Sequence, residues 1–221
     1  MKKKKEILKL LDKNRKYVFD EAVDVLRSVC SKKFEETIEA SLCFNVMPRK
    51  NIIIKGFSVL KHNIGKKYKI AVLSETSEKF DNCVFLHDDD LKNLNKKNIS
   101  FDVILTSPLL IVKFSKLNKL LNSKAIMPDV KYGTVTTDVF GMLNKLNNNY
   151  VKYKIDKNYI LNILIGKINL SSSSLRENLE QLIADIKKQK PQNCKSVNVK
   201  SLVLSSTMGP GIKIDIDSLN C

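Results

Sequence analysis

The sequence predicts an α+β discontinuous domain built from both ends of the chain, with an α/β domain inserted between its two halves. Stretches that alternate apolar and polar residues, typical of half-buried antiparallel strands, occur toward both termini. Short continuous apolar runs, typical of a parallel sheet covered on both faces, occur in the middle. We therefore expect residues 1–62 and 148–221 to form one domain, and residues 63–147 to form an inserted Rossmann-like domain with a parallel sheet.

The first half of the discontinuous domain contains one predicted helix and two predicted strands. Residues 20–34 have apolar side chains at helical spacing, and Asp20 is the expected cap. Residues 36–46 alternate strictly, which places five apolar side chains on one face of a half-buried strand. The run NIIIKGFSVL, residues 51–60, is the expected pairing partner of that strand.

The inserted domain contains three apolar runs and a closing helix. The runs are KYKIAVLS (67–74), NCVFLH (82–87) and FDVILTSP (101–108), separated by polar or helical stretches. This order favours parallel strands with crossover connections. The helix is predicted over residues 134–149.

The second half returns to alternating strands. Residues 150–170 predict two strands joined by a turn at Asp156 to Asn158. Residues 171–192 predict a helix with a serine cap, a leucine and isoleucine stripe, and a proline after its end. Two further strands, 196–207 and 211–216, flank the glycine-proline-glycine turn.

The charge of the chain indicates a polyanionic partner. The formal net charge is +16 and the pI is near 9.6, which favours nucleic acid over an anionic membrane surface because the lysines are spread over the whole chain. No apolar run approaches the ~18 residues of a membrane span. Arginine occurs at only four positions in this lysine-rich chain, and Arg49 is the one of most interest.

The sequence gives little support for a catalytic, metal or cofactor site. The five cysteines are scattered without a metal-binding spacing, so reduced thiols are expected. The stretch HDDD, residues 87–90, fits a helix start better than a metal site. Neither His62 nor His87 lies in a nucleophile motif, and both phosphate-loop motifs are absent. An enzyme that binds a nucleotide on the central α/β unit remains the alternative.

Four motifs together resemble one protein family. They are KFEETIE at 33–39, IMPDVKYGTVT at 126–136, IGKINL at 165–170 and TMGPG at 207–211. The chain resembles the family of bacterial-type large-subunit ribosomal protein one, over about residues 15–217. The resemblance implies a split domain that binds the stalk of large-subunit rRNA, beside the tRNA exit site, and an inserted α/β domain.

The resemblance also implies a set of rRNA-binding residues, carried over motif by motif. Asn162 stands where the family usually has a histidine. The first segment contains a phenylalanine that composition alone reads either as a core residue or as a base-stacking residue. The implied residues are Lys33, Phe34, Glu36, Thr37, Glu39, Arg49, Lys50, Asn162, Gly166, Lys167, Ser206, Thr207, Met208, Gly209 and Gly211.

The function implied by the resemblance is structural. The chain is expected to be a monomeric constituent of the large ribosomal subunit, in the cytoplasm or in an organelle, without a cofactor and without enzymatic activity. Its implied partners are the rRNA stalk, exit-site tRNA that it helps to release, and its own mRNA as a translational repressor. Glycine in the TMGPG turn lets backbone approach RNA closely, and the Thr207 hydroxyl can bind a ribose or base.

Overall fold

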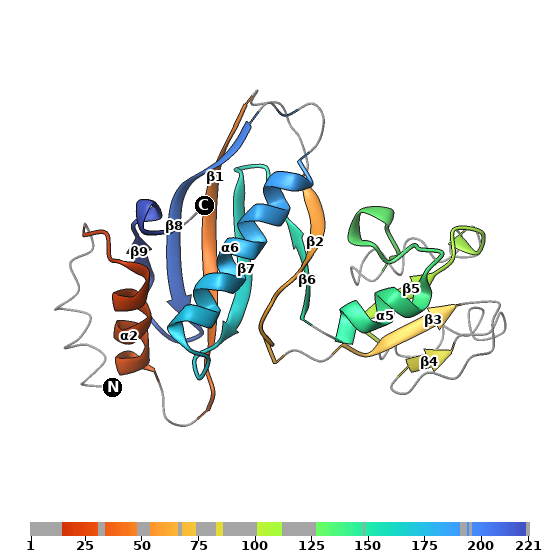
Figure 1. Cartoon of the computed structure of the whole chain (residues 1–221), viewed down its shortest axis with the longest axis horizontal. Helices are drawn as coiled ribbons and strands as arrows, with labels where there is room; N and C mark the ends of the chain where they lie inside the picture. The colour runs from red at the N-terminus through yellow and green to blue at the C-terminus, as the bar shows by residue number, and fades with distance from the viewer. Residues whose placement is uncertain are drawn as a thin grey trace. The chain divides into compact units, whose positions relative to one another are not determined.

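The computed structural model divides the chain into two compact units (Figure 1). The first consists of Met1–Gly65 and Val151–Cys221, and the second of Lys66–Tyr150. The structure describes residues 15–30, 34–47, 54–65, 68–73, 83–85, 101–111, 127–147, 149–190, 194 and 196–219.

The first unit contains a four-stranded antiparallel sheet in the order β7-β1-β8-β9. The strands are β1 (Thr37–Met47), β7 (Ile160–Lys167), β8 (Ser196–Ser206) and β9 (Ile212–Ile214). Every second residue of β1, from Ile38 to Val46, is buried, and the residues between them face the other side. The strict alternation in the sequence thus predicts this strand and its buried face correctly.

The partner expected for β1 is wrong. The run at 51–60 forms β2 (Lys55–Val59), which pairs with β6 (Tyr150–Lys154) in a separate two-stranded sheet. Both edges of β1 are occupied, by β7 and by β8, so no edge remains for β2. The strands β6 and β7 follow one another along the chain but belong to different sheets.

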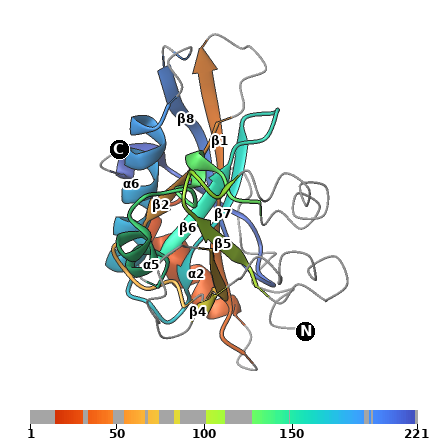
Figure 2. The same ribbon diagram turned by 90° about the vertical axis from the view of Figure 1, so that its right-hand side faces the viewer.

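Two helices cover one face of the four-stranded sheet. Helix α2 (Phe19–Val29) packs on β8 and β9, and α6 (Ser172–Lys188) packs on β7 and on α2. Figure 2 shows α6 on one side of strands β1 and β8. The serine cap of α6 is confirmed, because the Ser171 side chain accepts a hydrogen bond from the Ser174 N–H at 3.2 Å.

Helix α2 differs from its prediction at both ends. Val18 occupies the N-cap position without a side-chain hydrogen bond, and Asp20 lies inside the first turn. There the Asp20 carboxylate contacts Arg176 of α6 at 2.9 Å, so it links the two helices. The helix ends at Val29, well before Phe34.

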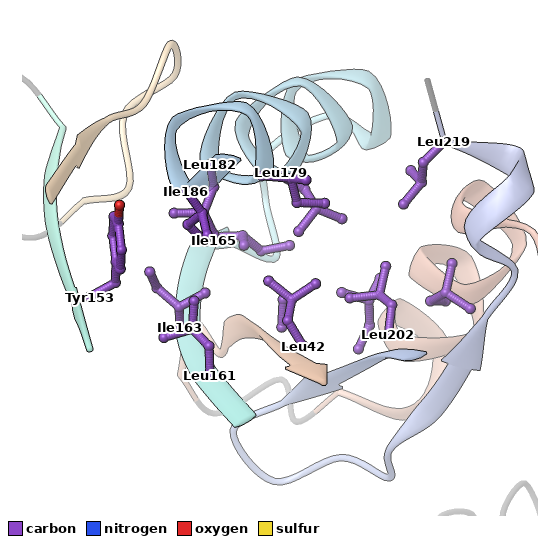
Figure 3. Close-up of a cluster of buried hydrophobic side chains, with 14 of the residues drawn as sticks. Leu42, Tyr153, Leu161, Ile163, Ile165, Leu179, Leu182, Ile186, Leu202 and Leu219 are labelled. Carbon is purple, nitrogen blue, oxygen red and sulfur yellow. The ribbon is translucent and has the colours of Figure 1, made fainter. Parts of the chain in front are cut away.

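The core of this unit lies between α6, α2 and the sheet. Figure 3 shows leucine and isoleucine side chains of α6 directed at residues of β1, β7 and β8. The predicted stripe of α6 is confirmed, because all five of its members are buried. They are Leu175, Leu179, Leu182, Ile183 and Ile186. Each fully buried side chain of this kind contributes roughly 1.5–3 kcal/mol of transfer free energy.

The second unit contains a three-stranded parallel sheet in the order β4-β3-β5. The three apolar runs form its strands β3 (Ile70–Leu73), β4 (Cys83–Phe85) and β5 (Val103–Thr106), as predicted. A 3-10 turn η2 (Val130–Tyr132) and helix α5 (Val139–Asn147) follow. The polar stretches between the strands, including residues 87–90, lie outside the described residues.

The remaining described element is a C-terminal 3-10 turn, η3 (Ile216–Ser218). Among the residues that the structure describes, none of the helices has the length and apolar character needed to cross a membrane.

Candidate functional site

Three of the segments singled out in the sequence meet at one end of the four-stranded sheet. Strand β1 begins there, and β7 and β8 both end there. The register pairs Thr37 with Lys167 and Ile38 with Ser206. The antiparallel pairing therefore brings residues 34–37, 166–169 and 206–209 together, although they are far apart in the chain. We call this group of residues the sheet-end cluster.

Two threonines join the first and third segments of the sheet-end cluster. The backbone N–H of Thr37 donates to Thr207 Oγ1 at 3.1 Å, and the Thr207 N–H donates to the Thr37 carbonyl at 3.1 Å. Their hydroxyl oxygens are 2.9 Å apart, so one hydroxyl donates to the other. The Thr207 hydroxyl thus has a structural partner, and its side chain is nevertheless exposed to solvent.

The buried Glu36 side chain supports the turn that contains Met208. Its side chain is only 1% exposed, and its carboxylate accepts a hydrogen bond from the Met208 N–H at 3.2 Å. Its backbone carbonyl accepts from the Ile168 N–H at 3.1 Å. Sequence resemblance places Glu36 on an RNA-facing segment, but in this structure the carboxylate is directed at the turn. Glu36 therefore positions the backbone of both neighbouring segments.

Ser206 and Gly209 form a tight contact at the start of the turn. The Gly209 N–H donates to the Ser206 carbonyl at 3.0 Å. A Cβ atom added to Gly209 would lie 2.2 Å from Ser206 Oγ, which is far inside van der Waals contact. The Ser206 hydroxyl is buried and has no hydrogen-bond partner among the described residues. A side chain at position 209 would therefore displace the Ser206 hydroxyl or the turn.

Phe34 and Met208 are the exposed apolar side chains of the sheet-end cluster. They are 50% and 58% exposed, and they lie in the segments that also carry the threonine pair. In the described part of the first unit, Val18 is the only other large hydrophobic residue with comparable exposure. Phe34 is half exposed, so it is not a core residue. Its ring is available to a partner.

The second segment adds an ion pair. Lys167 Nζ lies 2.8 Å from Glu35 Oε2, and the Asn169 amide donates to Glu35 Oε1 at 2.8 Å. The hydrogen bond from Lys167 and its positive charge hold the pKa of the Glu35 carboxyl below its ordinary value. Glu35 and Asn169 were not predicted from the sequence as site residues. Their only signal is their position beside predicted residues.

Gly166 has a packing role in this structure. A Cβ atom on it would lie 2.7 Å from methyl carbons of both Leu170 and Leu175, so it allows β7 to approach the start of α6. The loop between β7 and α6 is also held by Arg27, whose guanidinium donates to the carbonyls of Ile168 and Leu170. These contacts fix the backbone from which Lys167 extends.

Other predicted residues lie on the sheet face that the helices leave uncovered. Asn162 Oδ1 accepts a hydrogen bond from Ser41 Oγ at 2.6 Å, and Glu39 is exposed on the same face. Asn162 is five residues from Lys167 along β7, roughly 16 Å in an extended strand, so the structure does not bring it into the sheet-end cluster. A Cβ on Gly211 would lie 3.1 Å from Val203 Cγ1, where the chain turns into β9.

Three predicted residues, Lys33, Arg49 and Lys50, lie outside the described residues. Within the described ranges, no group of three or more histidine, cysteine or acidic side chains could hold a metal ion. His62 contacts Glu177 at 3.2 Å, and its backbone N–H donates to Asn178. These contacts give His62 a structural environment on the surface of α6.

Comparison with known proteins places the chain among ribosomal proteins. Residues 26–210 match the model of the ribosomal protein L1p/L10e family, and the chain belongs to that family. It is 38% identical to large ribosomal subunit protein uL1 of Francisella philomiragia subsp. philomiragia, over 99% of this chain and 97% of that protein. It is 37% identical to large ribosomal subunit protein uL1 of Francisella tularensis subsp. novicida, with the same coverage. These relatives bear the name of a structural ribosomal protein and not of an enzyme.

Proposed function

We propose that this protein is a structural constituent of the large ribosomal subunit, and that its sheet-end cluster binds the stalk region of large-subunit rRNA. Its family membership supports the first part. The second part rests chiefly on one observation: Phe34 and Met208 are exposed, and they lie in the two segments that the threonine pair joins. Aromatic and apolar side chains stack on unpaired bases, and hydroxyl groups bind the 2′-OH groups of RNA.

In this proposal, charge provides affinity for any RNA, and the shape of the sheet-end cluster provides specificity. Lysines of the chain, whose formal net charge is +16, bind phosphates without regard to sequence. Hydrogen bonds to Glu36 and Thr37 hold the backbone of the turn at Thr207 and Met208. A turn with a fixed backbone binds tightly only to an RNA of complementary shape. The proposed target is therefore a folded RNA with exposed bases, as in a stalk junction.

Two further activities belong to the same proposal. A protein fixed to the stalk beside the exit site is placed to assist the release of deacylated tRNA. An mRNA that folds like the stalk would occupy the same cluster, which would allow the protein to repress its own translation. Both activities depend on the same residues, so variants of the sheet-end cluster should impair both.

The binding proposal is tested with the double variant Phe34→Ala/Met208→Ala. Both side chains are exposed, so the variant should unfold at the same temperature as the wild type. Its affinity for the stalk RNA should fall by about fivefold or more, because one base–aromatic stack contributes about 1–3 kcal/mol. Its affinity for an unrelated folded RNA of equal length should not change. Equal affinity of both proteins for the stalk RNA would contradict the proposal.

A further inference from the structure

Both oxygens of the Glu35 carboxylate are hydrogen-bonded, one to the last residue of β7 and the other to a residue of the β7–α6 loop. Lys167 contacts one oxygen and Asn169 the other, each at 2.8 Å. Lys167 is the register partner of Thr37, whose hydroxyl contacts Thr207. The ion pair thus lies directly beside the threonine pair and one residue from Phe34.

The stem of Lys167 is also held in place. Gly65 has a φ of +71°, and a Cβ atom on it would lie 2.5 Å from Lys167 Cε. The aliphatic part of the lysine therefore crosses the backbone of Gly65 in close contact. Lys167 is fixed at its tip by Glu35 and along its stem by Gly65, unlike a lysine that moves freely in solvent.

An ion pair interacts with RNA differently from a free cation. Non-specific binding depends on cations that neutralise phosphates and release counterions. An ion pair of a lysine and a carboxylate has almost no net charge, so it adds little to non-specific phosphate binding. Its ammonium group has three N–H donors, however, and Glu35 uses only one of them. No other acceptor in the described part of the chain contacts the ammonium group, so its two remaining donors can bind an RNA group that fits.

We propose that Glu35 is a specificity-determining residue of the sheet-end cluster, which withdraws Lys167 from non-specific phosphate binding and presents its remaining donors to the matching RNA. This inference rests on the RNA-binding function proposed above. A chain with a formal net charge of +16 needs such elements, because lysine alone attracts every RNA in the cell. Discrimination often requires a group that penalises the wrong partner.

The test is a cycle of three variants, Glu35→Gln, Lys167→Gln and the double variant, measured on the stalk RNA and on an unrelated folded RNA over a range of salt concentrations. Glutamine keeps the size and the hydrogen-bonding carbonyl of Glu35 but removes its charge. Asp156→Asn is the matched control, because it makes the same charge change in the turn before β7, at the opposite end of that strand from Lys167.

When the ligand is the unrelated RNA, Glu35→Gln should free the Lys167 ammonium group to bind a phosphate. The log–log salt slope should steepen by about 0.7–0.9, which is roughly a five- to eightfold gain in affinity at 0.1 M salt. The stalk RNA should gain less than twofold, so the specificity ratio falls. Lys167→Gln alone leaves the Glu35 carboxylate without its cation, so it should weaken binding of the stalk RNA about tenfold and of the unrelated RNA by a smaller factor. In the double variant it should cancel the gain of Glu35→Gln. Asp156→Asn should change neither RNA.

Three results would overturn the inference. They are an equal gain on both RNAs in Glu35→Gln, an equal gain in Asp156→Asn, or a double variant that keeps the full gain of Glu35→Gln on the unrelated RNA. Failure of the proposed function has a different signature, namely a wild-type protein that binds the two RNAs equally. The effect of Glu35 on the unrelated RNA is read from its salt slope in either case.

Discussion

The hydroxyl group of Thr207 has a role inside the protein as well as toward a ligand. It accepts the Thr37 N–H and contacts the Thr37 hydroxyl, so Thr207→Val leaves a backbone donor of the sheet end without its acceptor. We expect a loss of about 1–3 kcal/mol in RNA binding, which is about five- to over a hundredfold in affinity for the stalk RNA. The salt slope should not change, because no charge is altered.

The control for that substitution is Thr37→Val, which removes the other hydroxyl and leaves Thr207 its backbone partner. Thermal unfolding of both variants separates lost stability from lost binding. If Thr207→Val binds the stalk RNA as tightly as the wild type does, the turn does not read RNA through this hydroxyl.

At Gly209 a substitution tests the shape of the turn. Gly209→Ala places a Cβ atom 2.2 Å from Ser206 Oγ, so the Ser206 side chain or the turn must shift, at a cost of about 1–3 kcal/mol in unfolding free energy. Ser206→Ala removes the obstructing oxygen, which has no hydrogen-bond partner among the described residues. The double variant should therefore recover most of the stability and RNA affinity lost in Gly209→Ala. Denaturant unfolding measures the recovery, and additive losses would contradict the account.

At the scale of the element, Asn178 of α6 connects three parts of the first unit. Its Oδ1 accepts the His62 N–H at 2.9 Å, and its Nδ2 donates to the carbonyls of Ile165 (3.0 Å) and His62 (3.3 Å). The side chain is fully buried. Asn178→Ala would leave these groups unsatisfied, so we expect a loss of about 1–3 kcal/mol in unfolding free energy. Urea unfolding measures it.

Glu177→Gln is the matched control on the adjacent residue. The Glu177 carboxylate contacts Lys61 and His62 at the surface, where ion pairs contribute little. Its loss should leave the urea midpoint unchanged. Equal destabilisation by both variants would show that surface charge, and not the buried amide, holds the residues after β2 on α6.

The same elements show what could be predicted from the sequence. The periodicity of β1 and of α6 predicts their buried faces because side-chain direction follows directly from the local backbone. The pairing of β2 could not be predicted this way, since several strands have similar patterns and only tertiary packing selects among them. The exposure of Phe34 depends on where α2 ends, and that end is weakly marked because Cys30 occupies the C-cap position and no glycine or proline follows it before Phe34. Glu36 and Glu35 differ in role although they are adjacent, and only the structure separates the buried positioning group from the exposed ion pair.

At the scale of the whole molecule, the division into two units leads to a prediction about RNA binding. We propose that the unit formed by Met1–Gly65 and Val151–Cys221 carries the RNA-binding function, because the sheet-end cluster lies entirely within it. A shortened chain that joins these two segments by a short linker should fold and bind the stalk RNA within about tenfold of the full chain. Circular dichroism and RNA titration measure both properties. A folded shortened chain that does not recognise the stalk RNA would place essential contacts in the second unit.

We propose that Phe34 and its neighbours contact large-subunit rRNA in the ribosome. It is tested most directly by replacing Phe34 with a photoreactive phenylalanine analogue, assembling the protein into ribosomes and mapping the crosslinked nucleotides. The same analogue at Val18, the other exposed hydrophobic residue of this unit, is the control. We expect a strong crosslink from position 34 to the stalk of large-subunit rRNA, and no crosslink from position 18 to the stalk. A position-34 crosslink only to protein, or equal crosslinking from both positions, would contradict it.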